Sequence, residues 1–312
     1  MEKYVFGVDV GGTTVKMGLF RADGTVVDKW EIPTRTEDNG SQILPDIAVA
    51  VLTKIKDLGI NKEDVEGIGI GVPGPVNEQG EVPVAVNLHW GYTRVAEDLS
   101  TMTGLKVRAG NDANVAALGE MWRGGGEGFK NLIMVTLGTG VGGGIIINGR
   151  IVYGTHGAAG EIGHAHVEDE ITDPCNCGNC GCLEQVTSAT GIVRLAEEAV
   201  AATDQPSLLR TSTITSRLVW DAVKSGDALA KQVAERFGMY LGKALSTFAV
   251  VCDPEVIVIG GGVSKAGPIL LDYIVKYYRK YAFSACKDVD FALATLGNDA
   301  GIYGAAKLVL ND

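Results

Sequence analysis

One pattern occurs twice in this 312-residue chain and limits its possible folds more than any other feature. An apolar strand, a turn of glycine and threonine, a second strand, a tight turn and a third strand follow one another over Val8–Val26 and again over Val135–Ile151. A supersecondary unit that returns in the second half of a chain predicts two similar lobes. The length agrees with this, because it exceeds what one ordinary core requires.

Strands and helices are expected to alternate along the rest of the chain, as in an α/β protein. Short apolar runs predict strands over Val65–Val72, Leu105–Ala109 and Glu255–Ile259. Apolar residues at helical spacing predict helices over Gln42–Leu58, Ala113–Met121, Val186–Ala201, Thr215–Val223, Asp227–Val250 and Ala300–Leu310.

In both copies of the repeat, the glycine-rich turn begins where an apolar strand ends. Glycine lets the backbone come close to phosphate oxygens, and threonine adds a hydroxyl donor. Each turn joins two strands, so it is neither a dinucleotide-binding fingerprint nor a Walker loop, both of which open a helix. We interpret the turns as phosphate loops, although each alone is also compatible with an ordinary hairpin. Their residues are Gly11, Gly12, Thr13 and Thr14 in the first copy, and Gly138, Thr139 and Gly140 of the turn Gly138–Gly144 in the second.

Other residues near these turns suit a phosphate ligand. Asp9, at the end of the first strand, is a candidate for holding Mg²⁺ directly or through water, and Lys16 supplies positive charge. A third glycine run, Gly260-Gly261-Gly262, follows a strand and precedes a helix. It is a further candidate for cradling an adenosine or a phosphate, or it is a plain strand-to-helix turn.

A polar pair, Asn111-Asp112, lies between a predicted strand and a predicted helix. Aspartate is a favoured N-cap, so Asp112 is a candidate cap. It is also a candidate general base for a hydroxyl that attacks a γ-phosphate, since phosphoryl transfer needs one positioned carboxylate and little covalent chemistry. The two roles are compatible.

Four cysteines lie within the eight residues Cys175–Cys182. In a chain without an export signal, clustered thiols favour a metal over a disulfide, and tetrahedral Zn²⁺ takes four nitrogen or sulfur ligands. Spacing alone leaves the fourth ligand open between Cys180, His164 and His166. Two carboxylates, Glu161 and Glu184, flank the cysteines and suit the vicinal hydroxyls of a sugar, unless they are solvated surface charges.

Charge and hydropathy exclude several partners. The net charge of −11 argues against nucleic acid and against an anionic membrane surface. The first residues run directly into an apolar strand without the pattern of a signal peptide, and no stretch approaches the roughly 20 apolar residues of a membrane span. We therefore expect a cytoplasmic protein.

Together these motifs resemble the ROK family (repressors, open reading frames and kinases), from Val5 to about Ala306. The resemblance lies in both glycine turns and in Gly160-Glu161-Ile162-Gly163-His164, followed by the cysteine motif that ends in Cys182-x-Glu184. It is strongest to the glucokinase branch. It implies a two-lobed, actin-like ATPase fold of the ribonuclease H type, with the phosphate loops on duplicated β-hairpins. We expect residues 1–110 plus 299–312 to form the small lobe, and 111–298 the large lobe that carries the zinc loop.

The same resemblance assigns roles to residues. It makes Asp112 the catalytic base and gives zinc the ligands His164, Cys175, Cys177 and Cys182, which leaves Cys180 as a spare thiol. It implies that the sugar is bound by Gly74, Asn87, Asn111, Asp112, Glu161, His164 and Glu184. In the implied arrangement zinc is structural, and one nitrogen of His164 binds it while the other faces the sugar.

The resulting prediction is phosphorylation of glucose at the 6-hydroxyl by ATP and Mg²⁺, a glycolytic step, in a homodimer or homotetramer. A kinase for N-acetylmannosamine, N-acetylglucosamine or fructose stays open, as does a phosphoryl donor such as polyphosphate. A sugar-sensing regulator without catalysis is disfavoured by the complete set of motifs. A DNA-binding regulator is disfavoured because Asp9 is the ninth residue and leaves no room for a preceding helix-turn-helix.

Overall fold

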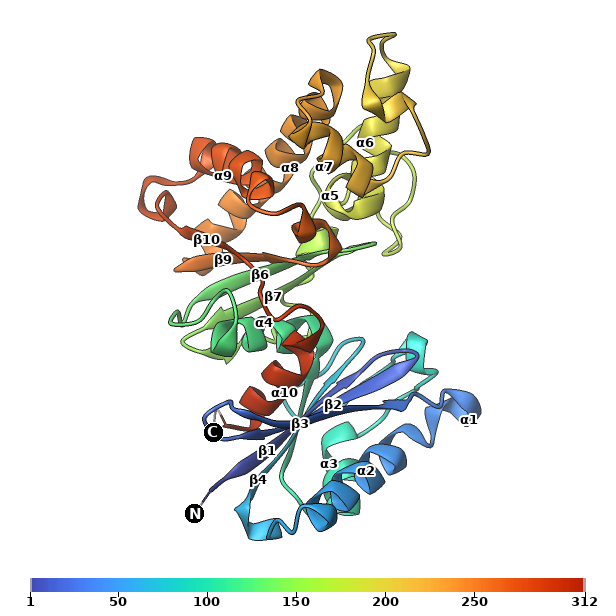
Figure 1. Ribbon diagram of the computed structural model, residues 1–312, viewed down its shortest axis with the longest axis vertical. Helices are drawn as coiled ribbons and strands as arrows, with labels where there is room; N and C mark the ends of the chain where they lie inside the picture. Colours follow the sequence, from blue (N-terminus) through green and yellow to red (C-terminus); the bar gives the residue numbers. More distant parts are fainter. Residues whose placement is uncertain (1, 311–312) are drawn as a thin grey trace. The chain divides into compact units, whose positions relative to one another are not determined.

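A computed structural model describes residues 2–310 of the chain (Figure 1). These residues group into two compact units. Unit 1 comprises the described residues up to Lys130, then Gly144–Gly160 and those from Leu296 onward, and unit 2 comprises Asn131–Gly143 and Glu161–Thr295. The predicted lobe boundaries, 1–110 plus 299–312 and 111–298, stay a prediction.

Unit 1 is built on a mixed sheet in the order β3-β2-β1-β4-β5. The hairpin β1–β2 and the pair β2–β3 are antiparallel, while β1–β4 and β4–β5 are parallel. The carboxyl ends of the parallel strands therefore share one edge, where loops can bind a ligand. The strand bounds are β1 Tyr4–Val10, β2 Thr14–Arg21, β3 Val26–Pro33, β4 Val65–Val72 and β5 Val107–Asn111.

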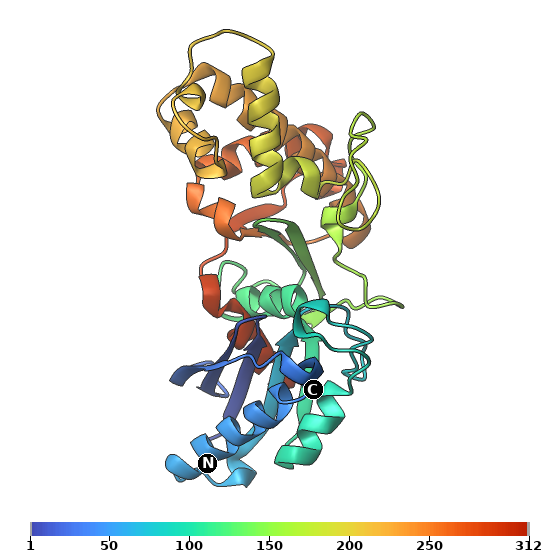
Figure 2. The ribbon, with the colours of Figure 1, turned by 90° about the vertical axis from the view of Figure 1, so that its right-hand side faces the viewer.

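Helices cover both faces of this sheet (Figure 2). Apolar side chains of α2, such as Ile47, pack with Phe6 and Val8 of β1, and α3 lies on the same side. The opposite face is covered by α10, which packs against β1 and β4, and by α4, which packs against α10. The helix bounds in unit 1 are α1 Glu37–Gly40, α2 Ile43–Asp57, α3 Val95–Thr103, α4 Asp112–Arg123 and α10 Ala300–Leu310.

The helices α4 and α10 touch backbone to backbone. A Cβ atom added at Gly304 would lie 1.7 Å from the carbonyl oxygen of Val115, and one at Gly119 would lie 2.2 Å from that of Ala300. Only glycine permits this approach. The last described helix, α10, therefore belongs to unit 1, which also contains the first strand, β1.

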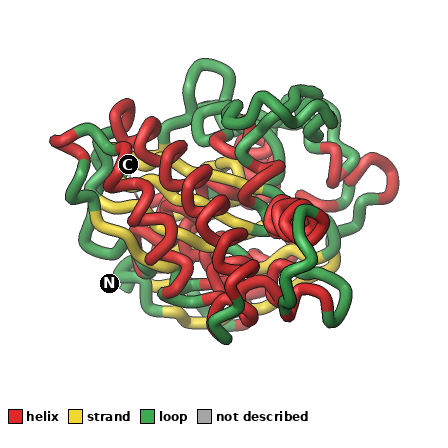
Figure 3. The backbone as a smooth tube through the Cα atoms, turned by 90° about the horizontal axis from the view of Figure 1, so that it is seen from above, coloured by secondary structure: helices red, strands yellow, loops and turns green. Residues whose placement is uncertain are grey.

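The second sheet has the order β10-β9-β6-β7-β8, and the division between the units falls within β7. Helices α5–α9 form a large apolar core with side chains of β6 and β9, such as Val135 and Ile257. Figure 3 shows the helices of the described chain in red and its strands in yellow. The bounds are β6 Leu132–Leu137, β7 Val141–Ile147, β8 Arg150–Ile151, β9 Val256–Gly260, β10 Asp290–Leu293, α5 Glu184–Thr187, α6 Ala189–Ala201, α7 Ser216–Lys224, α8 Ala228–Cys252 and α9 Ile269–Tyr281.

Two predicted elements need correction. The second glycine turn ends at Gly140, because β7 already begins at Val141. Gly144 lies inside this strand, where an added Cβ would come within 2.6 Å of Cβ of Ala117, so it serves close packing against α4 and not the turn. The helix predicted over Val186–Ala201 is divided at Ser188, whose extended backbone ends α5 and whose hydroxyl caps α6.

No helix within residues 2–310 is long and apolar enough to cross a membrane.

Candidate functional site

The first glycine turn joins β1 to β2 at the edge of the first sheet. Its backbone closes with a hydrogen bond of 3.0 Å from the amide of Gly11 to the carbonyl of Thr14. Thr34, just after β3, fixes the turn from outside: its amide donates to the carbonyl of Thr13 at 2.9 Å and its hydroxyl donates to that of Gly11 at 2.7 Å. The residues Gly11, Gly12 and Thr13 are exposed. Thr34 thus holds the carbonyls of Gly11 and Thr13 by hydrogen bonds, so the turn is suited to presenting amide donors to an anion.

The pair Asn111-Asp112 is at the start of α4, and the structure corrects which residue caps the helix. The side-chain oxygen of Asn111 accepts from the amides of Ala113 and Asn114 at 3.0 and 3.2 Å, so Asn111 is the N-cap. Its side-chain amide also donates to the carbonyl of Gly74 at 3.0 Å. Asp112 is the first helical residue and is exposed. The prediction that Asp112 caps the helix is therefore wrong, because the residue before it has the required extended backbone and reach.

Two carboxylates of unit 1 influence each other. Burial and, to a smaller extent, the nearby charge of Asp112 raise the pKa of Asp9 from 3.8 to about 6, although Lys16 acts to lower it. Lys16 donates to the carbonyl of Asn298 at 3.1 Å. Two carboxylates whose charges repel each other favour a bound cation, so this pair suits Mg²⁺.

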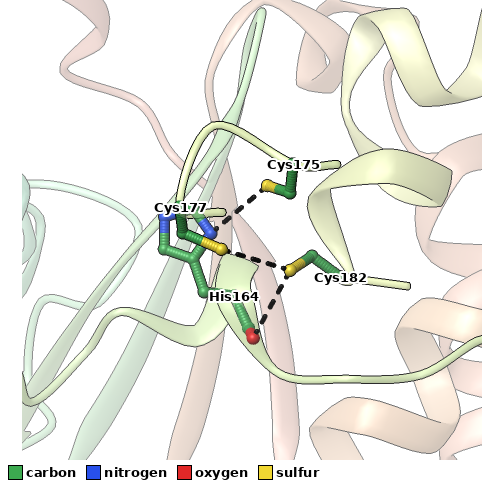
Figure 4. A group of neighbouring side chains, drawn as sticks. All are labelled: His164, Cys175, Cys177 and Cys182. Atoms are coloured by element: carbon green, nitrogen blue, oxygen red, sulfur yellow. Dashed lines mark hydrogen bonds between the residues drawn. The ribbon is translucent and has the colours of Figure 1, made fainter. Parts of the chain in front are cut away.

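A cluster of one histidine and three cysteines lies in unit 2 (Figure 4). The ligand atoms of His164, Cys175, Cys177 and Cys182 all lie within 4.8 Å of one another. Nδ1 of His164 is 3.6 Å from Sγ of Cys175, and Sγ of Cys177 is 3.6 Å from Sγ of Cys182. Ligands at the edges of a zinc tetrahedron are separated by about 3.4–3.8 Å, given metal–ligand bonds of ~2.0–2.3 Å. The cluster therefore fits Zn²⁺ and turns Nδ1, not Nε2, toward the thiols.

The two open alternatives for the fourth ligand lie outside this cluster. Cys180 donates its thiol to the carbonyl of Thr172 at 3.1 Å. His166 has both ring nitrogens engaged, with the carbonyl of Cys180 at 2.9 Å and the carboxylate of Asp169 at 2.7 Å. Among the described residues, the group that can hold a metal is thus the set implied by the family resemblance.

The protonation of the cysteines differs along the cluster. Burial raises the pKa of Cys182 to about 12 and also raises the pKa of Cys175. The backbone amide of Asn179 lowers the pKa of Cys177. Without metal, the buried thiols are therefore protonated at neutral pH, and a bound metal must displace their protons.

The second glycine turn is held by the segment that follows the cysteines. The amide of Ala189 donates to the carbonyl of Gly138 at 2.7 Å, and the hydroxyl of Thr190 donates to that of Thr139 at 3.1 Å. Oε2 of Glu184 accepts from the amide of Val141 at 2.9 Å. The turn thus depends on side chains and backbone from α5 and α6.

A cavity of about 700 Å³ in unit 2 opens beside this turn. Gly138 and Thr139 line it, as does Gly262, which follows β9. The sharp backbone at Gly261, with a φ of +82°, brings the end of β9 against Leu137, so two predicted glycine motifs meet in one cavity. The other lining residues are Ala189, Ser216, Arg217, Trp220, Asp221, Lys224, Val263, Lys265 and Ala266.

Sequence reasoning missed the contribution of α7 to this cavity. Ser216, Arg217, Trp220 and Lys224 recur at spacings that place them along one side of a helix, which is the signal that could have revealed them. Lys265 in the short helix after Gly262 was missed as well. Arg217, Lys224 and Lys265 give this otherwise acidic chain positive charge beside a glycine turn.

The remaining predicted residues are distributed between the units. Gly74 follows β4 with a φ of +95°, and Asn87 lies against the first turn, its carbonyl oxygen 3.7 Å from where a Cβ of Gly12 would stand. Glu161 is exposed and begins the turn of 3₁₀ helix that carries His164. Gly260 ends β9 and does not line the cavity.

Two α/β units, each with a hairpin that ends in a glycine turn, define the fold as that of the actin-like ATPases, and comparison with known proteins confirms this prediction. Residues 5–312 match the model of the ROK family. The chain is 46% identical to a glucokinase of Halalkalibacterium halodurans over 99% of this chain and 95% of the relative, and 34% identical to one of Thermotoga maritima over 98% and 96%. A solved ROK family glucokinase from Streptomyces griseus, in complex with glucose and AMPPNP, is 33% identical with a TM-score of 0.73, covering 98% of both chains. The chain belongs to the ROK family.

Proposed function

We propose that this chain is an ATP-dependent glucose kinase, which transfers the γ-phosphoryl group of ATP to the 6-hydroxyl of glucose. The observation that carries the proposal is the position of Asp112. It is exposed on the first turn of α4, where Asn111 is the N-cap and Oδ1 of Asp112 accepts from the amide of Ala113 at 2.8 Å, so the helix start fixes the position of the carboxylate. The choice of glucose rests on the glucokinases to which the whole chain is similar.

The carboxylates of unit 1 carry the chemistry in this proposal. Asp112 accepts the proton of the sugar hydroxyl as that oxygen attacks phosphorus. Asp9 would hold Mg²⁺, and the positive charge would offset the burial and the repulsion from Asp112 that together raise the pKa of Asp9. Asn111 contacts the sugar through the second N–H of its side-chain amide, because the first donates to Gly74.

The nucleoside of ATP occupies the cavity beside α7, and the second glycine turn, which lines this cavity, contacts its phosphates. A volume of about 700 Å³ is within the usual range of ligand sites. The indole Nε1 of Trp220 is buried and lacks a hydrogen-bond partner within residues 2–310. An unpaired buried donor costs about 1–3 kcal/mol, which an acceptor on the ligand would relieve. Arg217, Lys224 and Lys265 supply charge for phosphates.

The cysteine cluster serves the sugar side as a scaffold. When Zn²⁺ is bound it supplies a rigid tetrahedral centre and no electrophilic step. Ligation through Nδ1 fixes the ring of His164 and leaves Nε2 for a sugar hydroxyl, beside the carboxylates of Glu161 and Glu184. A cytoplasmic location and a homodimer or homotetramer stay predictions.

An ATP-coupled assay over a panel of hexoses, with metal analysis of the same sample, tests the proposal. We expect glucose to be the preferred substrate and about one zinc per chain. Strong turnover of an N-acetylhexosamine or fructose without turnover of glucose would overturn the substrate. A protein that binds glucose but transfers no phosphate from ATP would instead be a sugar sensor.

A further inference from the structure

Glu184 occupies a distinctive place in unit 2, because its carboxylate has different neighbours on its two oxygens. It begins α5, two residues after Cys182, and is half-buried. Oε1 is 3.6 Å from Sγ of Cys175, and Oε2 accepts from the amide of Val141 at 2.9 Å. One rigid planar group therefore joins the cysteine cluster to the start of β7.

The contact with the second glycine turn is close as well as polar. A Cβ atom added at Gly140 would lie 2.3 Å from Oε2 of Glu184, so the carboxylate rests directly on the turn. The hydrogen bond from the amide of Val141 fixes the residue that immediately follows Gly140. Removal of this acceptor would leave a partly buried amide unpaired and the turn without its support from α5.

The other oxygen faces the side of unit 2 where the proposed sugar ligands gather. Glu184 and His164 both contact Cys175, through Oε1 and Nδ1 respectively. A carboxylate oxygen has two lone pairs, so Oε1 can accept a sugar hydroxyl in addition to any bond from the cysteine. Sugar and phosphate turn then share one side chain.

We propose that Glu184 is a positioning residue that couples hexose binding to nucleotide binding. Oε2 holds the second phosphate turn, and a sugar hydroxyl on Oε1 fixes the carboxylate and thereby the turn. Each ligand raises the affinity for the other by the same factor, as linkage requires. This inference rests on the proposed function for the identity of the sugar, but the support of the turn does not.

The first experiment contains no sugar. The affinity for AMPPNP, a non-hydrolysable ATP analogue, is measured by calorimetry in the wild type and in the variants Glu184→Ala, Glu184→Gln and Glu161→Ala. We expect Glu184→Ala to weaken binding about tenfold, the loss of roughly one hydrogen bond. Glu184→Gln keeps a carbonyl acceptor for Val141 and should stay within about threefold of the wild type. Glu161→Ala, a matched control without contact to the turn, should leave AMPPNP affinity unchanged.

The second experiment repeats the titrations with saturating glucose. The wild type should bind AMPPNP more tightly by a factor of about 5 or more, within the usual range of coupling. Glu184→Gln, which presents an amide donor to the sugar, should reduce this factor to near one. Glu161→Ala should weaken glucose but keep the factor once glucose is saturating. Metal content and thermal unfolding of each variant show that it is folded.

The outcomes separate this inference from the proposed function. Wild-type AMPPNP affinity in Glu184→Ala, or an equal loss in Glu161→Ala, would overturn the support of the turn whatever the sugar is. An unchanged coupling factor in Glu184→Gln, which is isosteric and should fold, would overturn the coupling. If glucose does not bind the wild type, the proposed function fails, while the sugar-free titrations still decide the role of Glu184.

Discussion

The two glycine turns have the same sequence plan but different support. Thr34, from the neighbouring strand β3, holds the first turn through its amide and hydroxyl. The second is held by α5 and α6, through Glu184, Ala189 and Thr190. The first turn thus belongs to a sheet, while the second belongs to a helical segment that begins in the cysteine cluster.

This difference separates the proposed tasks. The unit with the first turn also contains Asp9 and Asp112, the carboxylates that suit catalysis and Mg²⁺. The unit with the second turn contains the cluster of His164 and three cysteines and the cavity beside α7. Loss of a carboxylate beside the first turn should therefore affect turnover, and loss of the metal cluster beside the second should affect sugar binding.

The largest effect should follow loss of the base beside the first turn. Asp112→Asn cannot accept the proton of the hydroxyl, so kcat should fall about 10²–10⁴-fold, the usual contribution of general base catalysis. Steady-state assays measure this, and metal content and glucose affinity should stay near those of the wild type. Asp272→Asn, at an exposed first-turn aspartate of α9, is the matched control and should leave kcat unchanged. Near-normal turnover in Asp112→Asn would refute the assignment.

Loss of a metal ligand should affect the second region and spare the chemistry. Cys182→Ser removes a buried ligand of the cluster, so zinc content should drop and KM for glucose should rise about 10–100-fold because His164 is no longer held. Cys180→Ser leaves the four-ligand cluster intact, so zinc content and KM for glucose should stay at the values of the wild type. Equal effects of the two substitutions, by metal analysis and kinetics, would show that the cluster is not the metal site.

The raised pKa of Asp9 should also make the stability of the protein depend on pH. The pKa of Asp9 is raised from 3.8 in the unfolded chain to about 6 in the fold, so the folded state binds the proton more tightly. Stability of the metal-free protein should therefore fall as pH rises from about 4 to 6 and stay lower above. Asp9→Asn, which cannot ionise, should stabilise the metal-free protein by about 3 kcal/mol at pH 7 and by less than about 1 kcal/mol at pH 4.

Thermal unfolding at the two pH values, without Mg²⁺, measures this difference. The variant should lose activity although it is more stable. A variant that is no more stable than the wild type at pH 7 would contradict the raised pKa of Asp9.

The smallest effects compare the turns directly. Thr34→Val and Thr190→Val each remove one hydroxyl that donates to a turn carbonyl, at 2.7 and 3.1 Å. Each should raise KM for ATP about threefold to fivefold, since one such hydrogen bond contributes ~1 kcal/mol. If the second turn is coupled to the sugar, only Thr190→Val should also change the dependence of ATP affinity on glucose. An equal change in this glucose dependence in both variants would contradict the distinction between the turns.

Much of the fold was predictable because local patterns agree with it. The repeated hairpins, α2 and α10 lie where apolar spacing places them, and the helix predicted over Ala300–Leu310 matches α10. The misplaced boundaries have physical causes. Gly142–Gly144 looks like a turn in sequence, but glycine also serves close approach within a strand, and only the packing of Gly144 on α4 distinguishes the two.

The grouping of the cysteines with His164 was predictable because the motif is local, whereas features that depend on packing were not predictable. The cysteine motif and Asp112 are short patterns with a direct chemical meaning. The cap was assigned to the wrong residue because Asn111 and Asp112 are both capping residues, and the choice depends on which one has extended backbone. The cavity side of α7 was missed because it contacts Gly138 and Gly262 only through tertiary structure.

The pairing of α10 with β1 has a consequence for synthesis of the protein. Nearly 300 residues separate Val10 from Ala300, yet α10 completes the core around Val5 and Phe20. At ~5–20 residues per second, the first strands leave the ribosome about 15–60 s before their covering helix exists. During that interval one face of the nascent sheet is uncovered and open to chaperones or to aggregation, while the helices of unit 2 can already fold.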